Sequence, residues 1–74
     1  MDSSTETSIE FVLNGQPARV ASGTTVADLV ASTLPNARAY AVELNRNVLS
    51  RRDHASRAIA PGDHVEIVTL VGGG

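Results

Sequence analysis

The Asn14-Gly15 pair is the feature that most restricts how this chain can fold. It stands within the stretch IEFVLNGQPARV, between two segments in which apolar and polar residues alternate. A two-residue turn of type I′ needs positive φ at both positions, which asparagine and glycine tolerate better than other residues. The pair therefore predicts a β-hairpin whose strands meet at Leu13 and Gln16.

A turn of this length also fixes which residues of the two strands lie opposite one another. The expected facing pairs are Leu13 with Gln16, Val12 with Pro17, Phe11 with Ala18, Glu10 with Arg19 and Ile9 with Val20. One face of the hairpin is then apolar, and the other carries an oppositely charged pair. Because proline cannot donate a hydrogen bond to a neighbouring strand, Pro17 indicates that the second strand lies at a sheet edge.

An amphipathic helix of about three turns is expected in the stretch SGTTVADLVASTLP. Its apolar positions, of which Val26, Leu29 and Val30 are the first, recur at helical spacing. Thr25 and Asp28 have the spacing of a capping box, with aspartate in place of the commoner glutamate. Proline closes the helix after Leu34.

The remaining sequence predicts two strands, an irregular crossing segment and a final strand. The stretch AYAVELN is expected as a strand with Tyr40, Val42 and Leu44 on one face, and a short strand is expected near Val48 and Leu49. In the segment SRRDHASRAIAPGD, Ile59 is the expected apolar plug and Asp63 is expected to cap the Pro-Gly turn. The last strand is HVEIVTLV, the most apolar of the set.

This order of elements predicts one domain of the α+β class with the β-grasp, or ubiquitin-like, architecture. We expect a mixed sheet of four to five strands packed on one helix, with the first and last strands parallel and adjacent and the last strand at the centre. Residues 9–71 would form this domain. Residues 1–8 are expected to be a disordered N-terminal extension, and residues 72–74 a flexible tail.

Composition excludes several functional classes. The net charge is −2, with six basic residues against eight acidic ones, so there is no basic field of the kind that binds nucleic acid. No apolar run approaches the roughly 20 residues of a transmembrane helix, and the polar start MDSSTETS differs from a secretory signal. We therefore expect a cytoplasmic protein without nucleic-acid or membrane partners.

Few residues are candidates for catalysis or metal binding. Cysteine is absent, which excludes thiolate nucleophiles and thiolate metal ligands. His54 and His64 have no further ligand or nucleophile at metal or triad spacing, so both are interpreted as surface or turn histidines. The acidic residues are single and dispersed, so no carboxylate pair is expected. The sequence predicts no enzyme and no metal site; SRRDH could dock an acidic partner, but a solvated loop is the simpler interpretation.

The three glycines at positions 72–74 follow the last strand directly. A segment without side chains can enter a narrow channel and reach roughly 10 Å beyond the fold. A terminal carboxylate joined to AMP by a partner becomes a mixed anhydride that a sulfur or amine nucleophile can attack. The pattern therefore indicates a carrier whose reactive group is its own terminus, and an inert frayed end is the alternative.

Strand parity predicts a docking surface beside the tail. If Val65 and Ile67 face the helix, then Glu66, Val68 and Leu70 face outward. Two exposed aliphatic side chains that lead into the tail favour a partner-docking patch.

Several stretches together resemble the ThiS family, the sulfur carrier protein of thiamine biosynthesis. They are AVELN at 41–45, Arg51, PGD at 61–63, VEIV at 65–68 and VGGG at 71–74. The resemblance covers residues 9–74, although the extension of residues 1–8 is longer than that family needs and the segment around His54 lacks the aromatic residue often found there.

The resemblance implies that Gly74 is adenylated by an E1-like adenylyltransferase and converted to a thiocarboxylate with a sulfur-donor system. Gly73 and Gly72 would complete the tail, and thiazole synthase would receive the sulfur. It implies no bound cofactor, since the activating partner would use ATP and Mg²⁺. Three alternatives stay open: the small subunit of molybdopterin synthase, a ubiquitin-like protein modifier, and a plain β-grasp interaction module with an inert tail.

Overall fold

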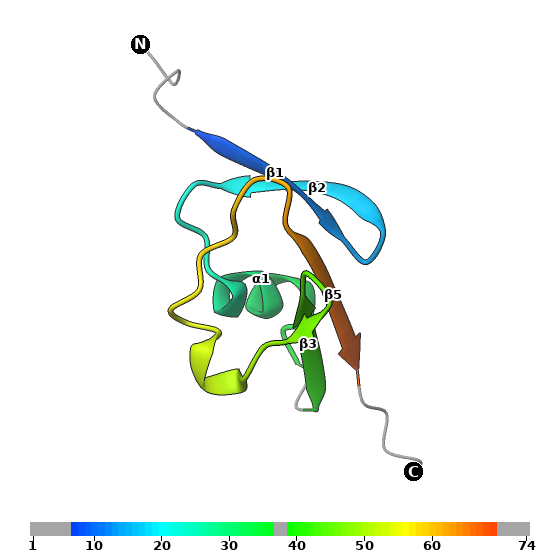
Figure 1. Cartoon of the computed structure of the whole chain (residues 1–74). Coiled ribbons are helices and arrows are strands. Elements are labelled where there is room, and N and C mark those ends of the chain that lie inside the picture. Colours follow the sequence, from blue (N-terminus) through cyan, green and yellow to red (C-terminus); the bar gives the residue numbers. More distant parts are fainter. Residues whose placement is uncertain (1–6, 37–38, 70–74) are drawn as a thin grey trace.

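The chain forms a mixed sheet with an α-helix packed across one face (Figure 1). The computed structural model describes residues 7–36 and 39–69. In chain order the elements are β1 (Ser8–Leu13), β2 (Gln16–Ala21), α1 (Val26–Thr33), β3 (Tyr40–Leu44), β4 (Asn47–Val48), a short 3₁₀ helix (Arg51–Asp53) and β5 (His64–Thr69). The sheet has five strands in the order β2-β1-β5-β3-β4. The predicted β-grasp architecture is confirmed: β1 and β5 are parallel neighbours, and β5 is central.

The β1–β2 hairpin has the predicted register throughout. Asn14 and Gly15 form its turn with φ of 50° and 80°, and all five expected pairs are present. Strand β2 lies at the edge, as Pro17 predicts. The hairpin begins one residue earlier than expected, because Ser8 pairs with Ala21. Residue 8 therefore belongs to the sheet and not to the N-terminal extension, of which residues 1–6 lie outside the described part.

Helix α1 begins as predicted and ends sooner. Both bonds of the capping box are present: the Asp28 amide donates to Thr25 Oγ1, and the Thr25 amide donates to a carboxylate oxygen of Asp28, each at 3.1 Å. The helix is eight residues long, about two turns, whereas about three were expected. Leu34 leaves the helical conformation with ψ of 69°, because the ring of the following Pro35 disfavours helical geometry in the residue before it.

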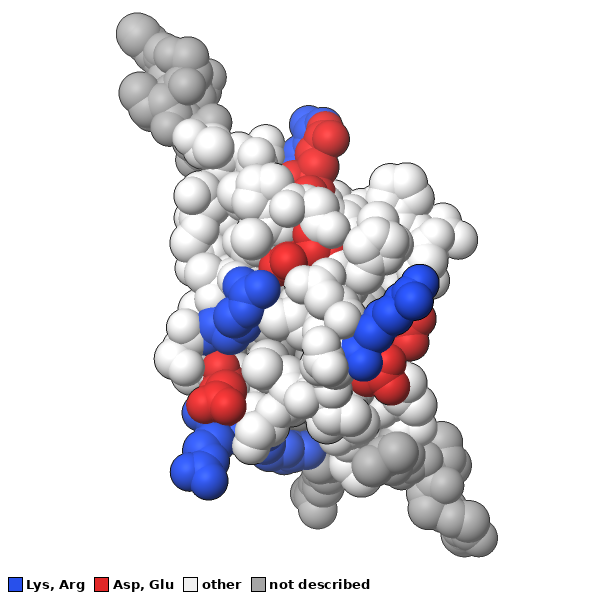
Figure 2. Space-filling model, viewed as in Figure 1, with Lys and Arg blue, Asp and Glu red and all other residues white. Residues whose placement is uncertain are grey.

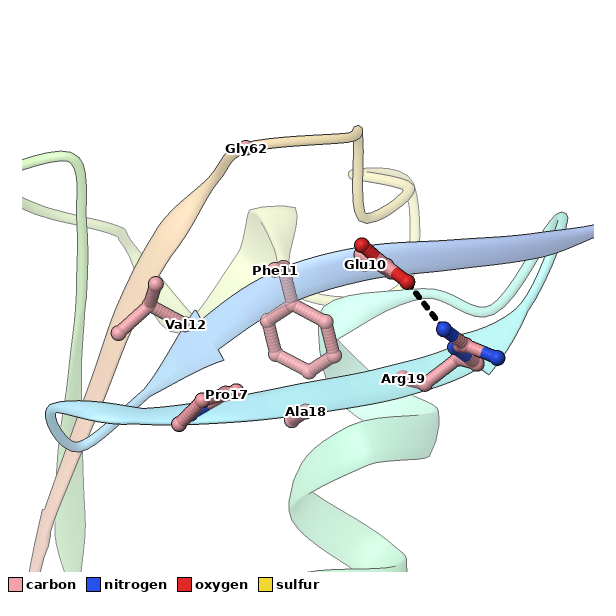
Figure 3. Close-up of a pocket in the computed structure, with 7 residues that line it drawn as sticks. All are labelled: Glu10, Phe11, Val12, Pro17, Ala18, Arg19 and Gly62. Atoms are coloured by element: carbon pink, nitrogen blue, oxygen red, sulfur yellow. Dashed lines mark hydrogen bonds and ion pairs between the residues drawn. The ribbon is translucent and has the colours of Figure 1, made fainter.

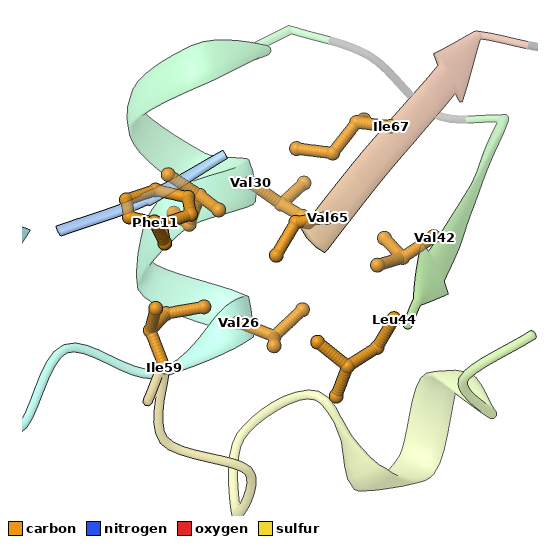
Figure 4. Packing of buried hydrophobic residues seen from close by; sticks show 9 residues of the cluster. Phe11, Val26, Val30, Val42, Leu44, Ile59, Val65 and Ile67 are labelled. Carbon is orange, nitrogen blue, oxygen red and sulfur yellow. The ribbon is translucent and has the colours of Figure 1, made fainter. Parts of the chain in front are cut away.

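The core lies between α1 and the sheet (Figure 4). Its buried members are Phe11, Val26, Leu29, Val30, Val42, Leu44, Ile59, Val65 and Ile67. Ile59 enters it from the segment between β4 and β5, as predicted, and its amide donates to the carbonyl of Thr24 at 2.9 Å. The short strand expected near Val48–Leu49 is found one residue earlier, at Asn47–Val48.

Candidate functional site

Strand β5 carries the residues that lead toward the glycine tail. Val65 and Ile67 are buried against the core, while Glu66 is exposed and Val68 retains 49% of its surface. The predicted parity of this strand is therefore confirmed for the described residues. Leu70 and the tail residues Gly72, Gly73 and Gly74, which the sequence also marks as functional, lie outside them.

Two turn asparagines hold β5 in place. Asn14 Oδ1 accepts the amide of Ile67 at 2.8 Å, beyond the point where β1 stops pairing with β5. The side-chain Oδ1 of Asn45 accepts a hydrogen bond from the backbone amide of His64 at 2.9 Å. The backbone amide of Asn45 donates in turn to the carbonyl oxygen of His64 at 2.7 Å. Both asparagines have positive φ, 50° and 52°. The residues that permit the turns therefore also hold β5, Asn45 at its first residue and Asn14 at its fourth.

Asp63 links the residues around the start of β5 and is itself buried. Its Oδ2 accepts the Ala60 amide at 2.8 Å and lies 3.3 Å from Nη2 of Arg57. Its Oδ1 accepts from Nδ2 of Asn45 at 3.0 Å. The predicted cap of the Pro-Gly turn is thus confirmed, and the same carboxylate also joins that turn to the β3–β4 turn.

The sheet face opposite α1 carries a set of outward residues on three adjacent strands. We name it the outer patch; it consists of Ala41, Glu43, Val48, Glu66 and Val68. Ala41 lies opposite Val68, and Glu43 lies opposite both Val48 and Glu66. Val48 is 74% exposed. Of these residues, the parity of the last strand predicts only Glu66 and Val68, although the alternation in AVELN also places Ala41 and Glu43 on the face away from the core.

The two histidines have different environments. His64 is exposed at the start of β5. His54 lies in a turn, which is one of the two predicted positions, but not at the surface, because this residue is only 5% exposed. Its Nε2 lies 3.2 Å from the carbonyl oxygen of Leu49, and its ring lies 5.9 Å from that of Tyr40. His54 therefore packs as a ring against the core edge, the kind of position that an aromatic residue can fill.

An open hollow of about 540 Å³ lies on the hairpin (Figure 3). Its lining residues are Glu10, Phe11, Val12, Pro17, Ala18, Arg19 and Gly62. Glu10 and Arg19 form the predicted ion pair there. These residues provide neither a nucleophile with an adjacent base nor a set of metal ligands, so the hollow is not a candidate for catalysis.

The described residues carry both charged side chains and side chains of the types that bind metals. Basic and acidic side chains are scattered singly or in small groups over the face shown in Figure 2. Within residues 7–36 and 39–69, no group of three His, Cys, Asp or Glu side chains could hold a metal ion. No helix in the same part of the chain is long and apolar enough to cross a membrane.

Residues 7–36 and 39–69 define a ubiquitin-like β-grasp protein by their sheet order, by the parallel pairing of β1 with β5 and by the helix α1 that covers one face. The model of the ThiS family matches residues 11–74, so the chain belongs to the ThiS family. The crystal structure of a thiamine biosynthesis protein (ThiS) from Geobacter metallireducens is similar, with a TM-score of 0.73 and 30% identity. That match covers 89% of this chain and 100% of the other.

A curated relative extends the comparison. The chain is 32% identical over 66 residues to a thiazole synthase of Paramagnetospirillum magneticum. The match covers 89% of this chain but only 20% of that protein. The chain therefore spans about a fifth of the length of this relative.

Proposed function

We propose that this protein is the sulfur carrier for the thiazole moiety of thiamine. The observation that carries the proposal is the family match, which runs through the β-grasp domain and includes Gly74. The match to the ThiS crystal structure supports it over the whole length of that chain. A cytoplasmic location fits a carrier that depends on ATP.

In the proposed cycle, the carboxylate of Gly74 attacks the α-phosphate of ATP on an E1-like, Mg²⁺-dependent enzyme. Pyrophosphate leaves, and an acyl adenylate forms. A sulfur-donor system then supplies a sulfide equivalent that displaces AMP, which leaves a thiocarboxylate on Gly74. Thiazole synthase takes up the sulfur. The region of similarity within a protein named thiazole synthase supports this partner.

In this cycle the chain presents its terminal carboxyl group to the partner enzymes, and the partners perform the catalysis. Strand β5 is held by Asn14 and Asn45 at the centre of the sheet. Five residues separate Thr69 from the end of Gly74, so the reactive carboxyl group can reach at most about 17 Å from the last described strand residue. The partners must therefore dock close to the end of β5, where Ala41 and Val68 of the outer patch lie.

Deletion of Gly74 is expected to abolish thiocarboxylate formation, because Gly73 would then end one residue short in the partner's active site. The measurement is the intact mass after incubation with ATP, Mg²⁺, a sulfide source and the cognate activating enzyme. The full-length protein should gain the mass difference of one oxygen replaced by sulfur. If it gains none while the same enzyme modifies another carrier, the proposed function is wrong.

Replacing Leu70 with glutamate is expected to weaken binding to the activating enzyme about tenfold, because an apolar contact becomes a charge that must be desolvated. The dissociation constant measured by calorimetry tests this. Ala31→Glu is the matched control, since Ala31 is exposed on α1, which covers the other face of the sheet. Equal affinities for the two variants would show that Leu70 is outside the docking surface.

A further inference from the structure

We propose that the outer patch binds an arginine or lysine side chain of the activating enzyme, with Glu43 and Glu66 as the charged contacts and Val48 and Val68 as the apolar flanks. This inference rests on the proposed function, because it names the chemistry by which that partner recognises the carrier.

The first argument is the register of β3 and β5. Glu43 and Glu66 lie directly opposite one another in this antiparallel pair, and facing residues have Cβ atoms roughly 5 Å apart. Like charges at such positions destabilise a sheet. In the β1–β2 pair, by contrast, facing charges have opposite sign, since Glu10 lies opposite Arg19 and forms an ion pair with it.

The second argument is that neither carboxylate of this pair has a bonded side-chain partner among the described residues. In the part of the chain that the structure describes, neither Glu43 nor Glu66 makes an ion pair or a side-chain hydrogen bond. Arg46 and His64 line a shallow hollow together with the two glutamates. Arg46 forms no ion pair within 4.0 Å with either of them. The two carboxylates are therefore available to a cation from outside.

The third argument is what surrounds the carboxylates. Val48 lies across from Glu43 on β4, and Val68 stands two positions beyond Glu66 on β5. Both valines are exposed. A long basic side chain can lay its methylene stem on aliphatic groups while its head meets carboxylates, and arginine can bind two carboxylate oxygens at once. Exposed valines on β4 and β5 thus flank the two facing glutamates.

The choice of partner follows from position. Val68 precedes Leu70 by two residues, and the tail begins at Gly72. The outer patch begins near the end of β5 at Val68 and runs back to Glu66 and Glu43, so a partner seated on it also covers the end of β5. The activating enzyme is the partner that must receive the unmodified terminus, so the cation is assigned to it.

The test is the double variant Glu43→Gln/Glu66→Gln, in which shape is kept and both charges are removed. Its dissociation constant for the activating enzyme should rise about tenfold at low salt, and its affinity should depend less on salt concentration than that of the unmodified chain. Its melting temperature should be unchanged or higher, because a repulsive pair has been removed. Asp53→Asn is the control, since this aspartate is exposed on the 3₁₀ helix and outside the outer patch.

A double variant with the affinity and salt dependence of the unmodified chain would overturn the inference. A loss of affinity accompanied by a lower melting temperature would also overturn it, because the glutamates would then be structural. Failure of the unmodified protein to bind the enzyme or to gain sulfur would overturn the proposed function as well. The two failures are distinguishable, because only the second appears without any substitution.

Discussion

Ile59→Ala is expected to lower the free energy of unfolding by about 2–5 kcal/mol, the usual range for truncating a buried isoleucine. Ile59 is 4% exposed and closes the core from the segment between β4 and β5. A domain of 74 residues has roughly 4–11 kcal/mol of stability in total. The variant should therefore melt at least about 8 °C lower.

The measurement is thermal and urea unfolding followed by circular dichroism, because the chain has no tryptophan for fluorescence. Val48→Ala is the control, since Val48 is exposed and its truncation should change stability by at most about 0.5 kcal/mol. Ile59→Val should fall between the two at about 1 kcal/mol. If Ile59→Ala has the same melting temperature as Val48→Ala, the segment between β4 and β5 is not part of the cooperative core.

The elements predicted best are those fixed by neighbours in sequence. The Asn14-Gly15 turn set the whole register of the hairpin, because a two-residue loop leaves no freedom in pairing. The Thr25 and Asp28 capping box set the start of α1 for the same local reason. Helix α1 ends earlier than its apolar spacing predicts, because the effect of Pro35 on the residue before it outweighs that spacing at Leu34.

The features missed depend on contacts between residues far apart in sequence. The burial of His54 arises because the 3₁₀ segment folds back onto Tyr40 of β3 and the start of α1. Its sequence neighbours are arginines and an aspartate, so local polarity indicated a surface position. Likewise, the sequence indicates Asn14 only as a turn residue and Asn45 only as the end of a strand, because their side-chain bonds to β5 depend on the tertiary arrangement.

The residues of the candidate site also differ in whether one stretch of sequence is enough to predict them. The tail and the outward parity of Glu66 and Val68 could be predicted from β5 alone. That Glu43 and Val48 join them could not, since it requires the pairing of β3 with both β4 and β5. The repulsive pair in the outer patch is consequently a property of the sheet and not of any one stretch of sequence.

Asp63→Asn is expected to cost about 2–3 kcal/mol, although it changes the shape of the side chain very little. Both carboxylate oxygens accept from protein donors: one from Asn45, the other from the Ala60 amide and Arg57. An amide in either orientation must place its NH₂ group against one of these donors, and hydrogen bonds that involve charged groups contribute about 1.5–3 kcal/mol. Urea unfolding of the variant measures the loss.

Amide hydrogen exchange separates a local from a global effect. The amides of Ala60 and His64 should lose protection first, because the first bonds the Asp63 carboxylate directly and the second bonds Asn45, which the carboxylate orients. Asp53→Asn removes the same charge from an exposed site and should leave both amides protected. Unchanged protection of Ala60 in Asp63→Asn would contradict the role given to the carboxylate. Loss of protection at His64 as well would show that Asp63, through Asn45, helps to hold the start of β5 in the sheet.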